Sequence, residues 1–285
     1  MSQSLTRAVV VYGRMIKFSH SIFAMPFALA AAVLASRQVE VRPLQVVGIV
    51  ICMVLARSCA MGFNRIVDRK FDALNPRTAI REIPSGQMSL GAAVGITAAA
   101  ALLFVAASFL LNPLCGYLSP VALAVVCGYS YAKRFTSLVH LWLGVALGLA
   151  PIAVWIALKG TVEATPLWIA GAVATWVSGF DILYSLQDED FDRSQGLHSI
   201  PARLGQVGAL WVSGLLHVAT AAMLAVVGVT EGVGIPYWLG WAAITGVLAY
   251  EHYLVRPGDL SKIDKAFFDL NGYVSLVFLL AVWLG

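Results

Sequence analysis

The part of the sequence that decides the fold runs from residue 83 to residue 132 and reads IPSGQMSLGAAVGITAAAALLFVAASFLLNPLCGYLSPVALAVVCGYSYA. It contains no Asp, Glu, Lys or Arg. Because a helix that crosses a bilayer needs about 20 apolar residues, there is room for two crossings, separated near Asn112-Pro113 and Gly116. Further uncharged runs cover residues 135–158, 204–230 and 270–285. The chain is therefore expected to cross a membrane several times.

The composition also favours a membrane protein. Of the 285 residues, 60% are hydrophobic and only 12% are charged, whereas a soluble globular domain is about a quarter charged. Such a chain has too little polar surface to remain in water. Soluble enzymes and soluble binding proteins are therefore excluded, and we infer neither a nucleic-acid partner nor a protein partner.

Nine apolar segments are predicted to span the membrane as helices of a single domain that covers residues 1–285. Backbone groups inside a bilayer must pair within their own segment, which predicts helices. The segments are too long and too continuously apolar to be strands of a transmembrane barrel. The expected fold is an all-α, polytopic bundle, with segments at 16–36, 44–66, 90–111, 116–132, 138–158, 166–186, 207–229, 234–253 and 266–284.

The basic residues predict the orientation of the chain. With the N-terminus inside, fifteen of the 19 Lys and Arg residues lie on the inner face, three lie on the outer face, and Arg57 lies within a segment. This bias predicts a cytoplasmic N-terminus. The expected location is the inner membrane of a bacterium, with the lipid bilayer as the surroundings.

Polar residues interrupt the apolar pattern where three of these segments end. The first group is Asn64, Asp68 and Asp72, at the end of the second segment. Residues four apart share one face of a helix, so their oxygen atoms are expected to form a column. Arg57 lies seven residues before Asn64 and is expected on the same side.

The second polar group lies at the end of the sixth segment and comprises Asp181, Tyr184, Asp188 and Asp192. The third lies at the end of the fourth segment and comprises Tyr129 and Lys133. Asp188 and Asp192 repeat the four-residue spacing, and the second group is expected to form one helical stripe. All three segments end at the same predicted face. We therefore expect the three groups to converge on one cavity at the cytoplasmic side.

Two facing columns of carboxylates repel each other unless a cation lies between them. Mg²⁺ prefers oxygen ligands and is often held by one or two carboxylates together with substrate phosphates. The spacing therefore indicates a site for Mg²⁺ and a diphosphate, with Arg57 and Lys133 available for the remaining negative charge.

Other polar residues have simpler interpretations. Glu189 and Asp190 are expected to face water and not to bind metal. None of the histidines has the spacing of metal ligands, so hydrogen-bonded or interfacial roles are expected for them; they are His20, His140, His198, His217 and His252.

These motifs resemble the UbiA superfamily of intramembrane aromatic prenyltransferases. The resemblance covers nearly the whole chain, and the motifs that carry it are Asn64-x₃-Asp68-x₃-Asp72, Tyr129-x₃-Lys133, Asp188-x₃-Asp192 and the flank Arg77-Thr78-Ala79-x-Arg81-x-x-Pro84-Ser85-Gly86. It implies nine helices around a central cavity that opens toward lipid. It also implies Mg²⁺-dependent transfer of a polyprenyl chain from its diphosphate to an aromatic acceptor.

Carried over position by position, the resemblance implies a role for each motif residue. The implied Mg²⁺ ligands are Asn64, Asp68, Asp72, Asp188 and Asp192. The four aspartates and Lys133 are the implied catalytic residues. The implied contacts of the polyprenyl diphosphate are Arg57, Asn64, Tyr129, Lys133 and Tyr184. The candidates for binding the carboxylate of the acceptor are Arg134, Arg65 and His20.

The family's first motif usually has Asp after the Asn, and Arg65 stands there in this chain. The overall pattern is most similar to the 4-hydroxybenzoate polyprenyltransferases of ubiquinone-type biosynthesis. The run from Asn64 to Thr78 also resembles a bacterial branch that prenylates 1,4-dihydroxy-6-naphthoate in menaquinone biosynthesis. Both acceptors are aromatic acids, and both remain open. A secondary transporter, with polar residues inside a multi-span bundle, is the alternative from another class.

Overall fold

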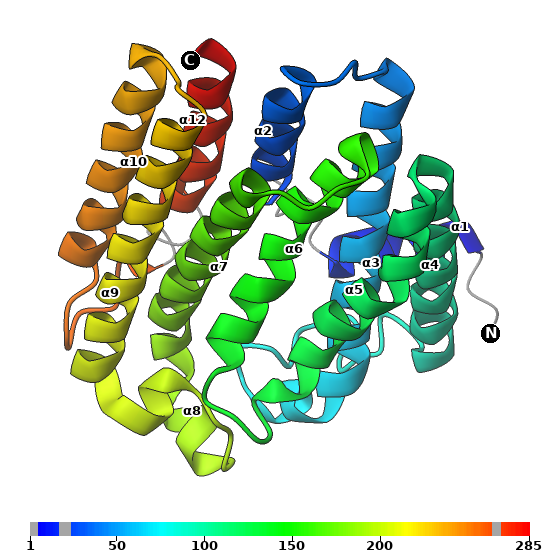
Figure 1. Cartoon of the computed structure of the whole chain (residues 1–285). Helices are drawn as coiled ribbons and strands as arrows, with labels where there is room; N and C mark the ends of the chain where they lie inside the picture. Colours follow the sequence, from blue (N-terminus) through cyan, green and yellow to red (C-terminus); the bar gives the residue numbers. More distant parts are fainter. Residues whose placement is uncertain (1–4, 17–23, 264–268) are drawn as a thin grey trace. The chain divides into compact units, whose positions relative to one another are not determined.

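The computed structural model describes residues 5–16, 24–263 and 269–285, and this part of the chain is almost entirely helical (Figure 1). The prediction of an all-α protein is confirmed. In chain order the helices are α1 (Leu5–Met15), α2 (Met25–Ser36), α3 (Pro43–Leu74), α4 (Leu90–Leu111), α5 (Pro113–Ala132), α6 (Val139–Lys159), α7 (Ala164–Ser185), the 3₁₀ turn η2 (Leu186–Asp188), α8 (Glu189–Ser194), α9 (Ile200–Thr230), α10 (Ile235–Leu254) and α12 (Asn271–Leu284).

Six helical stretches in the described part are long and apolar enough to cross a membrane, namely Pro43–Leu74, Leu90–Leu111, Pro113–Ala132, Val139–Lys159, Ala164–Ser194 and Ile200–Thr230. The apolar helices α2 and α12 are shorter, and the predicted segments around them reach into residues 17–23 and 264–268, outside the described residues. Helix α10 has 20 residues but is not one of the six. A polytopic membrane protein is confirmed, and the count of nine spans stays a prediction.

The chain divides into two compact units. The first comprises residues 1–21 and 44–131, and the second comprises residues 22–43 and 132–285. The first unit therefore contains α1, α3, α4 and α5, and the second contains the remaining helices.

Helix α3 is the central element of the first unit. Its Gly48 lies against Leu111 of α4, and its Cys59 Sγ is 3.9 Å from Cys127 Sγ of α5. A helix of 32 residues is about 48 Å long, whereas the hydrocarbon core of a bilayer is about 30 Å thick. Helix α3 can therefore cross the bilayer and still carry its last turns, which hold the acidic motif, beyond the hydrocarbon.

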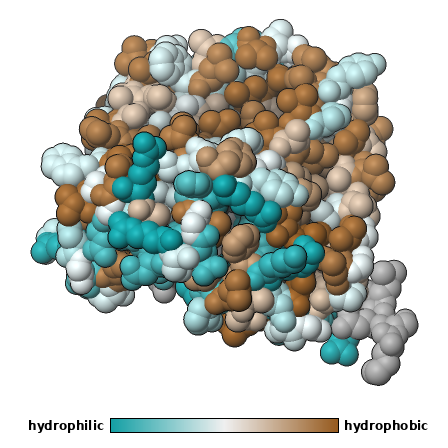
Figure 2. All heavy atoms as spheres, turned by 90° about the horizontal axis from the view of Figure 1, so that it is seen from below, coloured by the Kyte–Doolittle hydropathy of each residue, from teal (hydrophilic) through white to brown (hydrophobic). Residues whose placement is uncertain are grey.

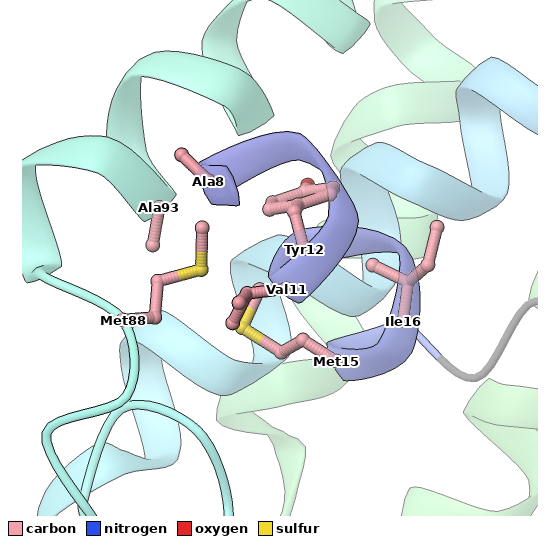
Figure 3. Packing of buried hydrophobic residues seen from close by; sticks show 7 residues of the cluster. All are labelled: Ala8, Val11, Tyr12, Met15, Ile16, Met88 and Ala93. Atoms are coloured by element: carbon pink, nitrogen blue, oxygen red, sulfur yellow. The ribbon is translucent and has the colours of Figure 1, made fainter. Parts of the chain in front are cut away.

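Helix α1 is amphipathic and packs on the same unit. Figure 3 shows its buried face meeting Met88 and Ala93 near the start of α4. The hydroxyl of Tyr12 donates to the carbonyl of Ser58 at 2.8 Å and lies 3.0 Å from the Thr97 hydroxyl. Burial raises the pKa of Tyr12 to about 12, so the phenol stays a neutral hydrogen-bond donor. These contacts attach the N-terminal helix to α3 and α4.

Helix α7 is the core of the second unit, and it packs between α6 and α9. Gly144 and Gly148 of α6 bring that helix close to the backbone of α7, since a Cβ at either position would meet α7 carbonyl oxygens. Small residues permit this approach in membrane helix pairs. Helices α10 and α12 pack on each other, and α2 packs on α6 and α12.

Helix α9 begins before its membrane part. The Ser199 hydroxyl accepts from the backbone N–H of Ala202 at 3.2 Å and caps the helix. Gly205 then adopts φ +69°, a left-handed conformation that favours glycine. The helix therefore begins before the predicted apolar segment at 207–229, and it is kinked at Gly205.

The long helices expose apolar side chains, as expected for surfaces that face lipid. Leu102 and Leu110 of α4 are examples. Figure 2 looks at the end where α8 lies in Figure 1, and hydrophilic side chains gather there among hydrophobic ones. The motif residues Asn64, Asp68 and Asp72 lie in the last turns of α3, and Asp188 and Asp192 lie beyond the end of α7.

Trp176 provides a direct test of the second unit's core. It is fully buried, packs at a tilt against Phe27 with 5.0 Å between ring centroids, and donates from Nε1 to Asn271 Oδ1 at 2.6 Å. We expect Trp176→Ala to lower the free energy of unfolding by about 3–5 kcal/mol. Thermal unfolding in detergent measures this effect. Trp283→Ala, at an exposed tryptophan, is the control; an equal loss in both variants would contradict the packing described.

Candidate active site

The first acidic motif lies on one uninterrupted helix, as predicted. Asn64, Asp68 and Asp72 belong to the last three turns of α3. The Asn64 Nδ2 donates to Asp68 Oδ2 at 2.7 Å and lies 3.4 Å from the Ser130 hydroxyl of α5. The amide therefore holds the Asp68 carboxylate in place and links the column to the neighbouring helix.

Arg65 is buried beside this column, with only 6% of its surface exposed. Its Nη1 donates to Asn64 Oδ1 at 3.2 Å, and its charge interacts with Asp68, Asp72 and Arg81. Of the two roles open to Arg65 from the sequence, contact with lipid headgroups or with an anionic acceptor, its burial excludes the first. The guanidinium instead orients the Asn64 amide, so that its Nδ2 points to Asp68 while its oxygen keeps a second lone pair for a metal ion.

Asp72 ends the column and is held by the loop that follows α3. Its Oδ1 accepts from Arg81 Nη1 at 2.6 Å, and its backbone carbonyl accepts from the Thr78 hydroxyl at 3.1 Å. The other carboxylate oxygen, Oδ2, is buried and has no hydrogen-bond partner among the described residues. One oxygen of Asp72 thus remains available for a cation.

Arg57 lies deeper in α3, where its Nε is buried without a hydrogen-bond partner within the described part of the chain. A buried guanidinium group without a complete set of acceptors is costly unless a ligand completes it. This position fits the predicted role of Arg57 as a contact for negative charge, and that role stays a prediction.

The second acidic motif is not one continuous helical stripe, and this prediction is wrong. Helix α7 ends at Ser185, the turn η2 covers Leu186–Asp188, and α8 begins at Glu189. A 3₁₀ turn advances fewer residues per turn than an α-helix, which rotates the side chains that follow it. Tyr184 therefore ends one helix, while Asp188 and Asp192 lie beyond the break.

Asp192 is buried and paired with Lys133. The Lys133 Nζ lies 3.1 Å from Asp192 Oδ2, and the aspartate side chain is 2% exposed. Two backbone bonds hold the pair, because His198 N–H donates to the Lys133 carbonyl at 2.7 Å and Leu197 N–H donates to the Asp192 carbonyl at 2.8 Å. This ion pair joins two of the residues implied by the motifs.

The remaining predicted residues have varied surroundings. Tyr129 lies near the end of α5 and is half-buried, as are Tyr184 and Asp188 in the second unit. Lys133 and the exposed Arg134 follow the end of α5, in the turn at 133–135, rather than continuing the helix. The three groups are divided between the two units, so their convergence on one cavity stays a prediction.

Glu189 does not face water as expected. It is buried, and its Oε1 accepts from Arg193 Nη2 at 2.9 Å one helical turn later. The break at η2 rotates Glu189 inward, whereas Asp190 is exposed as predicted. Glu189 therefore has a counter-ion of its own.

The histidines are mostly hydrogen-bonded, as predicted. His140 Nδ1 lies 2.6 Å from Asp181 Oδ2, and His217 Nδ1 lies 3.0 Å from His252 Nε2. His20 lies outside the described residues. The His140–Asp181 contact was not foreseeable from spacing, because the residues are 41 positions apart on different helices.

The residues of the first motif fit Mg²⁺. The donors on α3 are carboxylate and amide oxygens, and the buried Asp72 Oδ2 lacks a partner among the described residues. In that part of the chain no three His, Cys, Asp or Glu residues form a complete metal cage. Mg²⁺ needs no such cage, since it usually takes one or two carboxylates and completes its shell with phosphates and water.

Comparison with known proteins connects this arrangement to one family. The model of the UbiA prenyltransferase family matches residues 24–279. The 4-hydroxybenzoate octaprenyltransferase of Paraburkholderia phytofirmans is 32% identical over 214 residues, which are 75% of this chain and 74% of that protein. The protein of the same name from Pseudoalteromonas translucida is 31% identical over 236 residues, 81% of this chain and 78% of that protein.

Solved structures agree with this finding. A UbiA homologue from Aeropyrum pernix K1, solved without ligand, is 34% identical with a TM-score of 0.84, covering 91% of this chain and 95% of that one. A UbiA homologue from Archaeoglobus fulgidus bound to DMAPP and Mg²⁺ has a TM-score of 0.70 at 16% identity, covering 94% and 98%. The second likeness concerns the fold alone.

The Lys133–Asp192 pair gives a test of the local structure. We expect Lys133→Met to destabilise the protein by roughly 1–3 kcal/mol, because the buried Asp192 carboxylate loses its counter-ion. Asp192→Asn in the same chain should restore part of the loss. Thermal unfolding of the single and double variants measures the coupling. Lys70→Met, at an exposed lysine, is the control, and strictly additive effects at 133 and 192 would refute the pairing.

Proposed function

Because the chain belongs to the UbiA prenyltransferase family and is therefore a prenyltransferase, we propose that it transfers a polyprenyl chain from its diphosphate to 4-hydroxybenzoate, with Mg²⁺ as cofactor. The observation that carries the proposal is the column Asn64–Asp68–Asp72, which ends in an Asp72 oxygen that has no hydrogen-bond partner among the described residues. The names of the curated relatives support the acceptor.

The proposed Mg²⁺ ligands are those of the two acidic motifs, namely Asn64, Asp68, Asp72, Asp188 and Asp192. When bound, Mg²⁺ supplies neutralisation of the negative charge that develops on the leaving diphosphate. The UbiA homologue from Archaeoglobus fulgidus binds DMAPP and Mg²⁺, which supports a prenyl diphosphate as substrate and Mg²⁺ as cofactor.

The chain's own polar groups bind and orient the diphosphate. Arg57 and Lys133 balance its charge through charge-assisted hydrogen bonds, and the hydroxyls of Tyr129 and Tyr184 donate to its oxygens. These fixed donors stabilise the diphosphate as the allylic C–O bond breaks. Lys133 lies 3.1 Å from Asp192, so the lysine is held beside a proposed Mg²⁺ ligand. Arg134, which is exposed, is the proposed partner of the acceptor carboxylate.

We propose one prenyltransferase domain for the whole chain, with nine transmembrane helices. The extent of the family match, residues 24–279, supports a single domain. The excess of Lys and Arg on one predicted face supports a cytoplasmic N-terminus and cytoplasmic motif loops. The bacterial sources of the curated relatives support a bacterial inner membrane.

The second candidate acceptor is 1,4-dihydroxy-6-naphthoate. The run from Asn64 to Thr78, with the buried Arg65 inside it, favours this acceptor because it resembles the branch that uses it. Both molecules have an electron-rich ring carbon next to a hydroxyl. Both also carry a carboxylate that the protein can recognise. A transporter is no longer an alternative, since the family is that of an enzyme.

A direct assay tests the proposal. The purified protein in detergent receives a polyprenyl diphosphate, Mg²⁺ and each acceptor in parallel, and mass spectrometry detects the prenylated product. We expect product from 4-hydroxybenzoate, lost in EDTA and lost in Asp68→Ala and Asp188→Ala proteins that remain folded. Product from the naphthoate alone would replace the acceptor, whereas product that persists in EDTA would refute the role of Mg²⁺.

A further inference from the structure

A carboxylate outside the proposed Mg²⁺ ligands is held in the interior of the second unit. Asp181 lies in α7, one helical turn before Tyr184. Its Oδ2 is 2.6 Å from Nδ1 of His140, which lies in the first turn of α6 and is 1% exposed. The pair therefore joins two helices close to where the second acidic motif begins.

The protonation of His140 follows from its second contact. The backbone N–H of Ile200, the first residue of α9, donates to His140 Nε2 at 3.3 Å. An atom that accepts this hydrogen bond carries no proton, so the proton of the neutral ring is on Nδ1. The imidazole thus donates to Asp181, and three helices fix its orientation.

Asp181 differs from the other buried aspartates in the charge of its partner. Asp72 is paired with Arg81, and Asp192 is paired with Lys133. A neutral imidazole orients a carboxylate without cancelling its negative charge. The hydrogen-bond partner of Asp181 among the described residues is thus not a cation, which suits a group that accepts a proton.

The second oxygen of Asp181 is available to a ligand. The side chain is 17% exposed, and Oδ2 alone has a hydrogen-bond partner among the described residues. Because Asp181 is partly exposed, its Oδ1 can accept a hydrogen bond from a ligand. A phenolic hydroxyl is a donor of this kind.

We propose that Asp181 is the catalytic base that accepts the phenolic proton of the acceptor, and that His140 is the residue that positions it. The inference rests on the proposed function, because it assumes a phenolic acceptor. It adds to that function a base that is distinct from the metal and diphosphate ligands.

The proton balance of the reaction agrees with this role. As the allylic C–O bond breaks, its electron pair leaves with the diphosphate, and the ring carbon next to the hydroxyl forms the new C–C bond. The Asp181 carboxylate takes the phenolic proton, which leaves a dienone. The ring carbon then loses its proton, and Asp181 returns the first proton to the oxygen. One proton is released for each diphosphate.

The test compares acceptors of different acidity. In Asp181→Asn we expect kcat with 4-hydroxybenzoate to fall about 100-fold or more, while the KM for the polyprenyl diphosphate is unchanged. The second acceptor is 2,6-difluoro-4-hydroxybenzoate, whose phenol is more acidic and whose reacting ring positions are free. At a pH where this phenol is ionised no base is needed, so the ratio of wild-type to variant rates should shrink by about tenfold or more.

Variants of His140 separate positioning from structural support. His140→Asn keeps an N–H near the place of Nδ1, and we expect it to retain most of the activity. His140→Leu removes the donor and should lose about 10- to 100-fold in kcat, because the base is no longer oriented. His217→Leu is the matched control, since His217 is another buried histidine, which packs against Gly179 and hydrogen bonds to His252. It should lower thermal stability without changing the response to acceptor acidity.

The outcomes separate the inference from the function on which it rests. A wild-type protein that prenylates neither 4-hydroxybenzoate nor 1,4-dihydroxy-6-naphthoate would overturn the proposed function and the inference together. An active wild type with an equally active Asp181→Asn would overturn the inference alone. The inference alone would also be overturned if Asp181→Asn lost the same factor in rate with both acceptors, or if His140→Asn lost as much kcat as His140→Leu. If only the naphthoate reacts, the same variants are compared on that phenol.

Discussion

A carboxylate at the end of an apolar helix must find a cation or a hydrogen-bond donor, and the polar structure of this protein depends on that requirement. Asp72 meets Arg81, Asp192 meets Lys133, and Asp181 meets the neutral His140. The first contact fastens the loop that follows α3, whereas the other two join segments that are distant in the sequence: the turn after α5 to α8, and α6 to α7. The charged pairs leave one Asp72 oxygen without a hydrogen-bond partner among the described residues, while Asp181 meets an imidazole instead of a lysine or an arginine.

Arg65 shows how one substitution changes the electrostatics of a motif while the helix is preserved. A carboxylate at this position would add negative charge next to Asp68, whereas the buried guanidinium adds a positive charge and donates to Asn64. The column therefore carries less net negative charge before any Mg²⁺ binds, which reduces its self-repulsion. The hydrogen bond from Arg65 also keeps the Asn64 amide in a fixed orientation. This local change coexists with 34% identity to a solved homologue over most of the chain.

Much of the fold was predictable, because a bilayer imposes strong rules on apolar segments. The charge-free run at residues 83–132 became α4 and α5 with a break at Asn112, and the helical column of the first motif was correct. The 3₁₀ turn at Leu186–Asp188 was not predictable, since its four-residue spacings also suit an α-helix. The packing of α1 and the His140–Asp181 contact depend on tertiary structure, which spacing does not encode. Glu189 was misplaced because its orientation depends on that turn.

The central claim is that both acidic motifs hold Mg²⁺ for the diphosphate, and binding without turnover tests it most directly. Isothermal titration calorimetry with a prenyl thiolodiphosphate, which resists cleavage, measures affinity in Mg²⁺ and in EDTA. We predict binding in Mg²⁺ only, with a loss of about 100-fold or more in Asp68→Asn and in Asp188→Asn, equivalent to about 2.7 kcal/mol. Binding that is the same in EDTA, or that survives unchanged in either variant, would contradict the account.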